Sequence, residues 1–282
     1  MKGFINIIKP QGMSSAYAVG AVKRKFNMPC GHMGTLDPMA SGVLPVGLGK
    51  ATRLFDYLLD KKKTYVATFR FGVLTDTLDT TGTVTATCDK IPTSHEILSV
   101  LPRFIGEIEQ VPPLYSAKCV DGKRGYQLAR QGVDFKLTAK KVTILNVELL
   151  GQKGEADFDF KIECKGGTYI RSLARDIGEA LSTYGTMSAL DRTEAGIFDY
   201  SNGVTVEELK NAENPQDYLI APDEAVNFPK LILTAKQAKK ILDGVFLNYG
   251  FEDGTYRVYN QDEFWGVGVA SGGVLKIKAY VR

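Results

Sequence analysis

A loop at residues 31–42, GHMGTLDPMASG, holds residue types that could do chemistry. Asp37 and His32, one of only two histidines, stand among small residues directly before the apolar run VLPVGLG. Glycines let a backbone approach another molecule closely, and an aspartate displayed ahead of a strand can act as nucleophile or general base. A turn aspartate before Pro38 is the plainer interpretation of an isolated Asp-Pro pair. Because the same loop also holds His32 and Thr35, Asp37 is the first candidate for catalysis.

A second candidate is KGGTYIRS, residues 165–172, where two glycines lead from an expected strand into an expected helix. The N-terminus of such a helix offers free N–H groups and a partial positive charge. Arg171 would project from the first turn. On an ordinary helix it would be a solvated arginine; in a functional site it would be the ion-pair partner that keeps a catalytic aspartate ionised.

Two tyrosines and a lysine stand at the ends of expected elements. Tyr65 and Tyr169 each lie at the start of one, and Lys9 closes a strand before the turn Pro10-Gln11-Gly12. Core packing is the usual role of tyrosine, but a tyrosine beside a polar loop can instead stack on a base. Loops at strand ends are frequent ligand sites, so all three remain candidates for binding.

The elements that would position these residues mix strands and helices without strict alternation. The hydrophobic patterns predict strands at 4–9, 64–72, 82–87, 142–150 and 156–166. They predict helices after Ser14 or Ser15, at 51–60, at 94–104 with Ser94 as N-cap, and at 168–182. This irregular order favours an α+β fold with a mixed or antiparallel sheet. Three prolines within 211–230 indicate a connection, and 231–282 resembles a small, mostly β appendage.

Composition narrows the class of protein. No apolar run approaches the ~20 residues of a membrane span, and the start, MKGFINIIKPQG, does not resemble a signal peptide. The four cysteines form no C-x-x-C pair, which predicts reduced thiols in a cytoplasmic protein. His32 and His95 lack zinc-ligand spacing, and neither a P-loop nor a dinucleotide fingerprint is present. Four basic clusters in the first half, at 23–25, 61–63, 123–124 and 140–141, are compatible with a polyanionic partner.

Several motifs, taken in order, carry a resemblance to a known family. They are IIKPQGMSS, GHMGTLDPMASGVLPVGLGKATR, KTYVATFRFGVLTDTLDTTG, KGGTYIRSLARDIG and LDRTEAG. Together, from about residue 4 to 200, they resemble the TruB-type family of bacterial tRNA pseudouridine-55 synthases. The resemblance implies an α+β fold with a mixed, largely antiparallel sheet and flanking helices, and a small C-terminal PUA-like domain. The implied domains are 1–230, the catalytic domain, and 231–282, the PUA-like domain. The first would contain an RNA-binding insertion at about 115–150, which carries Lys118, Lys123, Arg124 and Lys140.

The resemblance also implies roles for individual residues. Asp37 matches the catalytic carboxylate, Tyr65 the tyrosine that stacks on the target base, and Arg171 the partner of the acid. Substrate binding is implied for four more positions: His32, Tyr169, Leu190 and Lys9. The family often has arginine where Asp191 stands, so Asp191 receives no role.

The implied reaction converts uridine at position 55 of the tRNA T loop into pseudouridine. It involves no redox change and no phosphate cleavage, so we expect no cofactor and no metal. The target base must be flipped out of the folded RNA. We expect tRNA as the partner, through its T arm, with no membrane, no obligate protein partner and a monomeric, cytoplasmic enzyme.

Two other classes of function stay open from the residues alone. A non-catalytic RNA-binding or tRNA-folding protein would also explain the basic clusters. A glycoside-type hydrolase would need a second carboxylate, for which Asp76 or Asp79 could serve. The segment DTLDTTG, however, is more typical of turn chemistry.

Overall fold

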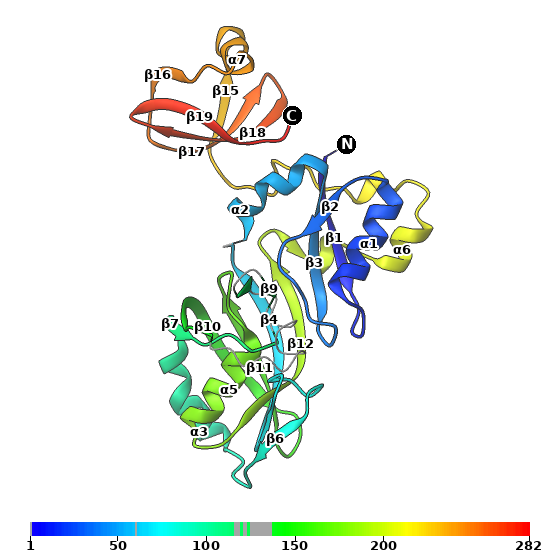
Figure 1. Cartoon of the computed structure of the whole chain (residues 1–282), viewed down its shortest axis with the longest axis vertical. Helices are drawn as coiled ribbons and strands as arrows, with labels where there is room; N and C mark the ends of the chain where they lie inside the picture. The colour runs from blue at the N-terminus through cyan, green and yellow to red at the C-terminus, as the bar shows by residue number, and fades with distance from the viewer. Residues whose placement is uncertain (1, 60, 116–118, 121–122, 125–136) are drawn as a thin grey trace.

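The structure, a computed structural model, describes residues 2–59, 61–115, 119–120, 123–124 and 137–282. Much of the expected insertion therefore lies outside the described residues, and with it the prediction for the side chains of Lys118, Lys123 and Arg124. The molecule is elongated, with one large sheet in its centre and a second sheet at one end (Figure 1).

The large sheet has the strand order β14-β1-β3-β12-β4-β11-β10-β7, with β13 beside β12 and β2 beside β3. Its pairs β1–β14 and β3–β12 are parallel and the others are antiparallel. The predicted mixed, largely antiparallel sheet is thus confirmed. Its strands are β1 (Gly3–Lys9), β2 (Cys30–His32), β3 (Ser41–Leu48), β4 (Lys63–Phe71), β7 (Gly106–Gln110), β10 (Lys140–Gln152), β11 (Asp157–Cys164), β12 (Gly185–Ala195), β13 (Phe198–Asp199) and β14 (Gly203–Thr205).

The second sheet lies in the last part of the chain and has the order β15-β17-β18-β19-β16. Its strands are β15 (Lys230–Leu233), β16 (Leu247–Phe251), β17 (Gly254–Asn260), β18 (Glu263–Ser271) and β19 (Gly273–Tyr280). Two short hairpins pair β5 (Val73–Thr75) with β6 (Val84–Thr87) and β8 (Cys119–Val120) with β9 (Lys123–Arg124).

The described helices are short. They are α1 (Ser15–Phe26), α2 (Phe55–Leu58), α3 (Ser94–Val100), α5 (Ile170–Ala180), α6 (Val206–Asn211) and α7 (Ala235–Leu242), with 3-10 turns η1 (Gly49–Leu54), η2 (Leu101–Phe104), η3 (Tyr200–Asn202) and η4 (Pro215–Tyr218). Within the part of the chain that the structure describes, none is long and apolar enough to cross a membrane.

Two helix starts test the predicted caps. Ser14 caps α1 and accepts the N–H of Tyr17, as expected. The prediction of Ser94 as N-cap is wrong, because Thr93 caps α3 instead. The Thr93 hydroxyl accepts the N–H of Glu96 at 3.2 Å, and the Glu96 carboxylate accepts the N–H of Thr93 at 2.8 Å. This reciprocal capping box satisfies two backbone donors and makes Ser94 the first helical residue.

Alternation along β4 divides its side chains between two faces. Tyr65, Phe69 and Phe71 point into a core beneath α5, where the rings of Phe69 and Phe160 lie 4.7 Å apart. A second core forms between α1 and the strands β1 and β3. Leu190 of β12 packs against both cores, so the two helix-covered halves of the sheet meet at that residue.

Close backbone contact fixes α5 on β12. A Cβ atom at Gly178 would lie 2.4 Å from the backbone nitrogen of Gly185, and one at Gly185 would lie 2.1 Å from the carbonyl oxygen of Ala174. Only glycine tolerates such an approach. The position of the helix that carries Arg171 is therefore set by two glycines, Gly178 in α5 and Gly185 in β12.

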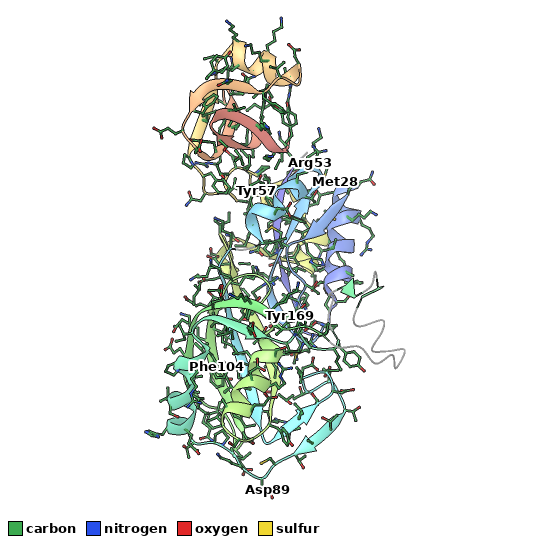
Figure 2. All side chains as sticks on the ribbon, turned by 60° about the vertical axis from the view of Figure 1, so that its left-hand side comes forward. Met28, Arg53, Tyr57, Asp89, Phe104 and Tyr169 are labelled. Atoms are coloured by element: carbon green, nitrogen blue, oxygen red, sulfur yellow. The ribbon has the colours of Figure 1, made fainter. Side chains whose placement is uncertain are left out.

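The second sheet packs on the large one rather than standing free. Phe4 of β1 shares a buried cluster with Phe264, Val267 and Val281. Arg53 donates to the carbonyl of Tyr280 at 2.8 Å, and Figure 2 shows Arg53 and Tyr57 at this junction.

Candidate active site

The loop that bears Asp37 connects β2 to β3 and is held at three points. The Ser15 hydroxyl donates to the carbonyl of Leu36 at 2.7 Å and accepts the N–H of Leu36 at 2.9 Å. The N–H of Gly12 donates to the carbonyl of Pro38 at 2.7 Å. Leu36 itself is buried. Asp37 is thus presented by a backbone that is fixed on both sides of it.

Lys9 supplies the third attachment from a fully buried position. Its ammonium group donates to the carbonyls of Pro10 at 3.0 Å, Met13 at 2.7 Å and Ala40. Burial is the largest influence on the pKa of Lys9 and lowers it to about 8, although the nearby charge of Asp37 opposes the shift. Three carbonyl acceptors use all three N–H bonds of the charged form, so Lys9 joins the turn after β1 to the end of the loop that bears Asp37.

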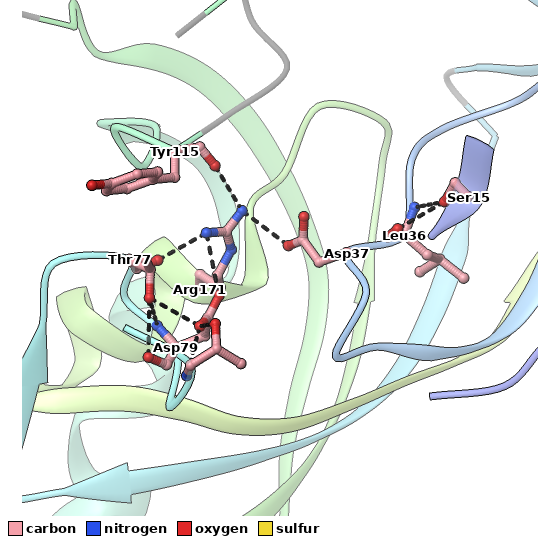
Figure 3. A network of polar contacts seen from close by, with 8 residues as sticks. Ser15, Leu36, Asp37, Thr77, Asp79, Tyr115 and Arg171 are labelled. Atoms are coloured by element: carbon pink, nitrogen blue, oxygen red, sulfur yellow. Dashed lines mark hydrogen bonds and ion pairs between the residues drawn. The ribbon is translucent and has the colours of Figure 1, made fainter. Parts of the chain in front are cut away.

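Arg171 binds four acceptors from three different segments (Figure 3). Its Nη2 lies 2.9 Å from Oδ2 of Asp37 and donates to the carbonyl of Tyr115 at 3.0 Å. Its Nη1 lies 3.4 Å from Oδ2 of Asp79 and donates to the carbonyl of Thr77 at 2.8 Å. The side chain is only 7% exposed. The prediction that Arg171 pairs with a carboxylate agrees with this geometry, and the alternative of a solvated arginine does not.

Asp37 and Arg171 border a cavity of about 440 Å³. Of the residues proposed from the sequence, Asp37, Tyr65, Tyr169, Arg171 and Leu190 line it. Three further cationic residues also line it: Lys63, Lys165 and Arg192. Among the described lining residues Asp37 is the only acid, so the cavity is strongly cationic around a single carboxylate.

The pKa of Asp37 is raised above its ordinary value, chiefly because burial disfavours the charged form. The charge of Asp79 also raises it, whereas the ion pair with Arg171 and the charge of Lys9 lower it. Loss of water around a carboxylate makes it a stronger base and nucleophile, and the pair with Arg171 keeps it ionised.

Tyr65 belongs both to the core and to the wall of the cavity. It is 7% exposed, packs in the cluster beneath α5, and lines the cavity. Burial above all raises the pKa of its hydroxyl, against the opposing charge of Arg192. The ring is therefore rigid and its hydroxyl neutral near pH 7, which suits stacking on a flat base.

Two predicted binding residues lie outside the cavity wall. Lys9 acts from behind the loop, as described above. His32 is half-buried at the end of β2, opposite Val46 of β3. It is not among the residues that line the cavity.

Sequence reasoning missed Arg192. Arg192 is 1% exposed, lines the cavity and donates to the carbonyls of Val43 at 2.7 Å and Gly34 at 3.2 Å. The available signal was its place directly after Leu190-Asp191 in the motif LDRTEAG. Asp191 itself accepts from the hydroxyls of Ser41 and Tyr200 at 2.8 and 2.6 Å, which is a structural role.

The geometry disfavours Asp79 as a second catalytic acid. Its Oδ1 accepts from the Thr77 hydroxyl at 2.9 Å and from the N–H of Thr81 at 3.0 Å, the turn chemistry expected for this segment. Its Oδ2 faces Arg171. It is 4% exposed and does not line the cavity. Without a second acid facing the cavity, the two-carboxylate arrangement of a glycoside hydrolase is not formed by the described residues.

Comparison with known proteins places this chain in a family. Residues 23–170 match the profile of the TruB family pseudouridylate synthase (N terminal domain), and residues 171–226 match that of the tRNA pseudouridylate synthase B C-terminal domain. The chain is similar to the tRNA pseudouridine synthase B of Clostridium kluyveri, 40% identical over 279 residues that cover 95% of this chain and 96% of the relative. It is also 38% identical to the tRNA pseudouridine synthase B of Caldanaerobacter subterraneus subsp. tengcongensis, over 98% of each chain.

A solved structure shares the fold. A chain of a Cbf5-Nop10-Gar1 complex superposes with a TM-score of 0.71 at 28% identity, over 95% of this chain and 78% of that one. Fold and site together define an enzyme of the pseudouridine synthase class. The chain belongs to the TruB family of pseudouridylate synthases.

Proposed function

We propose that this protein isomerises uridine to pseudouridine at position 55 in the T loop of tRNA, with Asp37 as the catalytic carboxylate. The observation that carries the proposal is the pair between Asp37 and Arg171, 2.9 Å apart at a cavity walled by Tyr65 and Leu190. Membership of the TruB family and the names of its relatives support the choice of tRNA. No atom is gained or lost, since the C1′–N1 bond breaks, the uracil turns, and C5 joins C1′ while its proton leaves for N1 or water.

The residues that line the cavity have different roles in the proposed reaction. Asp37 attacks the nucleotide at C1′ or C6, or removes the C2′ proton. Arg171 keeps it ionised and aimed. The base must leave the RNA stack, which costs a few kcal/mol, and stacking on Tyr65 at about 1–3 kcal/mol offsets part of that cost. We further propose that Tyr169 and Leu190 hold the flipped nucleotide. His32 would then fill the space in the RNA that this nucleotide vacates.

Incubation with an unmodified tRNA transcript tests this function. Carbodiimide mapping should reveal pseudouridine at position 55, and a transcript with cytidine at that position serves as the matched control. Free uracil in the medium would instead support hydrolysis. Binding without any modified uridine would support a non-catalytic RNA-binding protein.

We propose that residues 231–282 form a PUA-like RNA-binding domain beside a catalytic domain of residues 1–230. Two lysine ammonium groups in this segment lie over exposed rings, Lys276 over Phe246 at 4.5 Å and Lys240 over Tyr249 at 5.3 Å from the ring centres. Phe246 and Lys276 also line an open apolar hollow. Aromatic platforms beside cations are typical of contacts to unpaired nucleotides.

Substitution of Lys276 by alanine should weaken tRNA binding and flatten the slope of log affinity against log salt by about 0.7–0.9 if one phosphate contact is lost. Lys236→Ala, which removes an equal charge outside the hollow, is the control. An unchanged slope in Lys276→Ala would argue against RNA binding at this hollow.

We also propose a monomeric, cytoplasmic enzyme. The described cysteines Cys30, Cys88 and Cys164 are free thiols, which agrees with that location.

A further inference from the structure

Gln110 is a buried polar residue with an unusual pair of contacts. It closes the edge strand β7 and is 1% exposed. Its side-chain carbonyl accepts the N–H of Tyr169 at 2.8 Å, and its side-chain amide donates to the carbonyl of Tyr169 at 3.1 Å. One side chain therefore binds both backbone groups of a residue that lies 59 positions away.

Tyr169 is the N-cap residue of α5. Its own side chain does not cap the helix, so Gln110 supplies from another element an acceptor for one of the N–H groups that have no partner within the helix. The Gln110 amide adds a second donor to the Tyr169 carbonyl, which also accepts the N–H of Leu173 at 3.1 Å. Tyr169 lines the cavity, and Arg171 follows two residues later. The backbone that Gln110 holds thus carries two residues of the proposed site.

The segment that follows Gln110 is attached to the same helix turn. The carbonyl of Val111 accepts from the hydroxyl of Ser172 at 2.8 Å, and the carbonyl of Tyr115 accepts from Arg171 at 3.0 Å. Gln110 is therefore the first of several contacts between residues 110–115 and the start of α5. It differs from the others because it binds backbone, and so constrains the direction in which the helix starts.

We propose that Gln110 is a positioning residue for the isomerisation. This role of Gln110 rests on the proposed function. By fixing the backbone of Tyr169, Gln110 sets where the Tyr169 ring and the Arg171 guanidinium stand, and hence the geometry of the pair with Asp37. Gln110 does not line the cavity and acts only through these neighbours. Misplacement of a catalytic unit by about 1 Å can cost on the order of 100-fold in rate.

Gln110→Met tests the proposal, because methionine has a similar length and volume but neither donates nor accepts these hydrogen bonds. In single-turnover assays with saturating tRNA transcript, we expect the rate to fall about 10- to 100-fold while tRNA affinity stays near that of the wild type. A loosened Arg171 lowers the pKa of Asp37 less effectively. The acid limb of the rate profile should therefore move to higher pH. Gln110→Asn, which keeps the amide but is one methylene too short, should show the same split.

Thr183→Val is the matched control. Thr183 is also buried, and its hydroxyl donates to the carbonyl of Lys90 at 2.7 Å just beyond the other end of α5. Thermal melts of all variants show the cost in stability, and rates are measured well below each melting temperature. Thr183→Val should lose stability without a change in rate or pH profile.

The outcomes separate this inference from the proposed function. Wild-type rate and pH profile in both Gln110 variants would overturn the role of Gln110 alone. A rate loss equal to that of Thr183→Val would do the same, because it would show a merely structural effect. Absence of pseudouridine with the wild-type protein would overturn the proposed function and this inference with it.

Discussion

Two arginine–carboxylate pairs on opposite faces of the sheet have nearly the same length and very different surroundings. Arg171 lies 2.9 Å from Asp37 at the cavity, and Arg70 of β4 lies 2.8 Å from Asp157 of β11 on the open face. The side chain of Arg171 is 7% exposed, and that of Arg70 is 47% exposed. Distance alone therefore says nothing about which pair matters.

The difference lies in water and in the number of partners. Arg70 binds one carboxylate, through both its Nε and its Nη2, and water screens the pair. Arg171 binds two carboxylates and two backbone carbonyls from a buried position, and only the Asp37 carboxylate, 36% exposed, is open to the cavity. Breaking a buried pair leaves an uncompensated charge. We therefore expect substitutions at the cavity to change the reaction and substitutions on the open face to change almost nothing.

Arg171→Lys is expected to have the largest effect on turnover. Lysine keeps the charge but loses the planar fork that reaches four acceptors at once. Removal of one preorganised electrostatic contact typically costs about 100- to 1000-fold in turnover, and we expect a loss of that order with a smaller loss of tRNA affinity. Single-turnover rates and filter binding measure the two effects. Near-normal turnover would remove Arg171 from the site.

Tyr65 separates stacking from proton transfer. Leucine removes the ring face, which should weaken capture of the flipped base by about 1–3 kcal/mol. Phenylalanine keeps the face and removes only the hydroxyl. Slow turnover with normal binding in Tyr65→Phe would assign the hydroxyl a role in proton transfer. If both variants behave like the wild type, Tyr65 is only a core residue.

The pH dependence of turnover reports on the same buried charges. The pKa of Asp37 is raised, so activity should fall, as the pH drops, sooner than for an ordinary carboxylate. The pKa of Lys9 is about 8, so loss of its proton should loosen the loop and give a basic limb near that value. Asp79→Asn should move the acid limb to lower pH, because the charge of Asp79 raises the pKa of Asp37. A shift to higher pH would contradict this account.

The smallest effect is expected on the open face. Arg70→Ala should change the free energy of unfolding by no more than about 0.5 kcal/mol and leave turnover unchanged. Chemical denaturation and the tRNA assay measure both. A turnover loss comparable to that of Arg171→Lys would mean that the exposed face, too, belongs to the functional surface.

Local signals made much of this fold predictable. The alternation of residues 64–72 indicated β4, and the apolar face of residues 168–182 indicated α5. Motif resemblance placed Asp37, Tyr65, Tyr169, Arg171 and Leu190, which the structure brings to one cavity. Such signals report on residues that are close together in the sequence. They do not predict a contact that joins distant segments.

The contacts that were missed are of this long-range kind. Asp79 looks like a turn residue and is one, yet its second oxygen faces Arg171, which lies 92 positions away in the sequence. Gln110 ends a short strand without any local pattern to mark it, and its importance comes only from Tyr169. No periodicity or spacing encodes which buried polar groups meet after folding.

Asp37→Asn tests most directly whether the carboxylate of Asp37 performs the isomerisation. The amide keeps the shape of the side chain but can neither attack nor accept the proton. The pure Asp37→Asn variant, mixed in excess with an unmodified tRNA transcript and mapped with carbodiimide at position 55, should bind the RNA with near wild-type affinity and form no pseudouridine. Pseudouridine formation at a rate near that of the wild type would contradict the account.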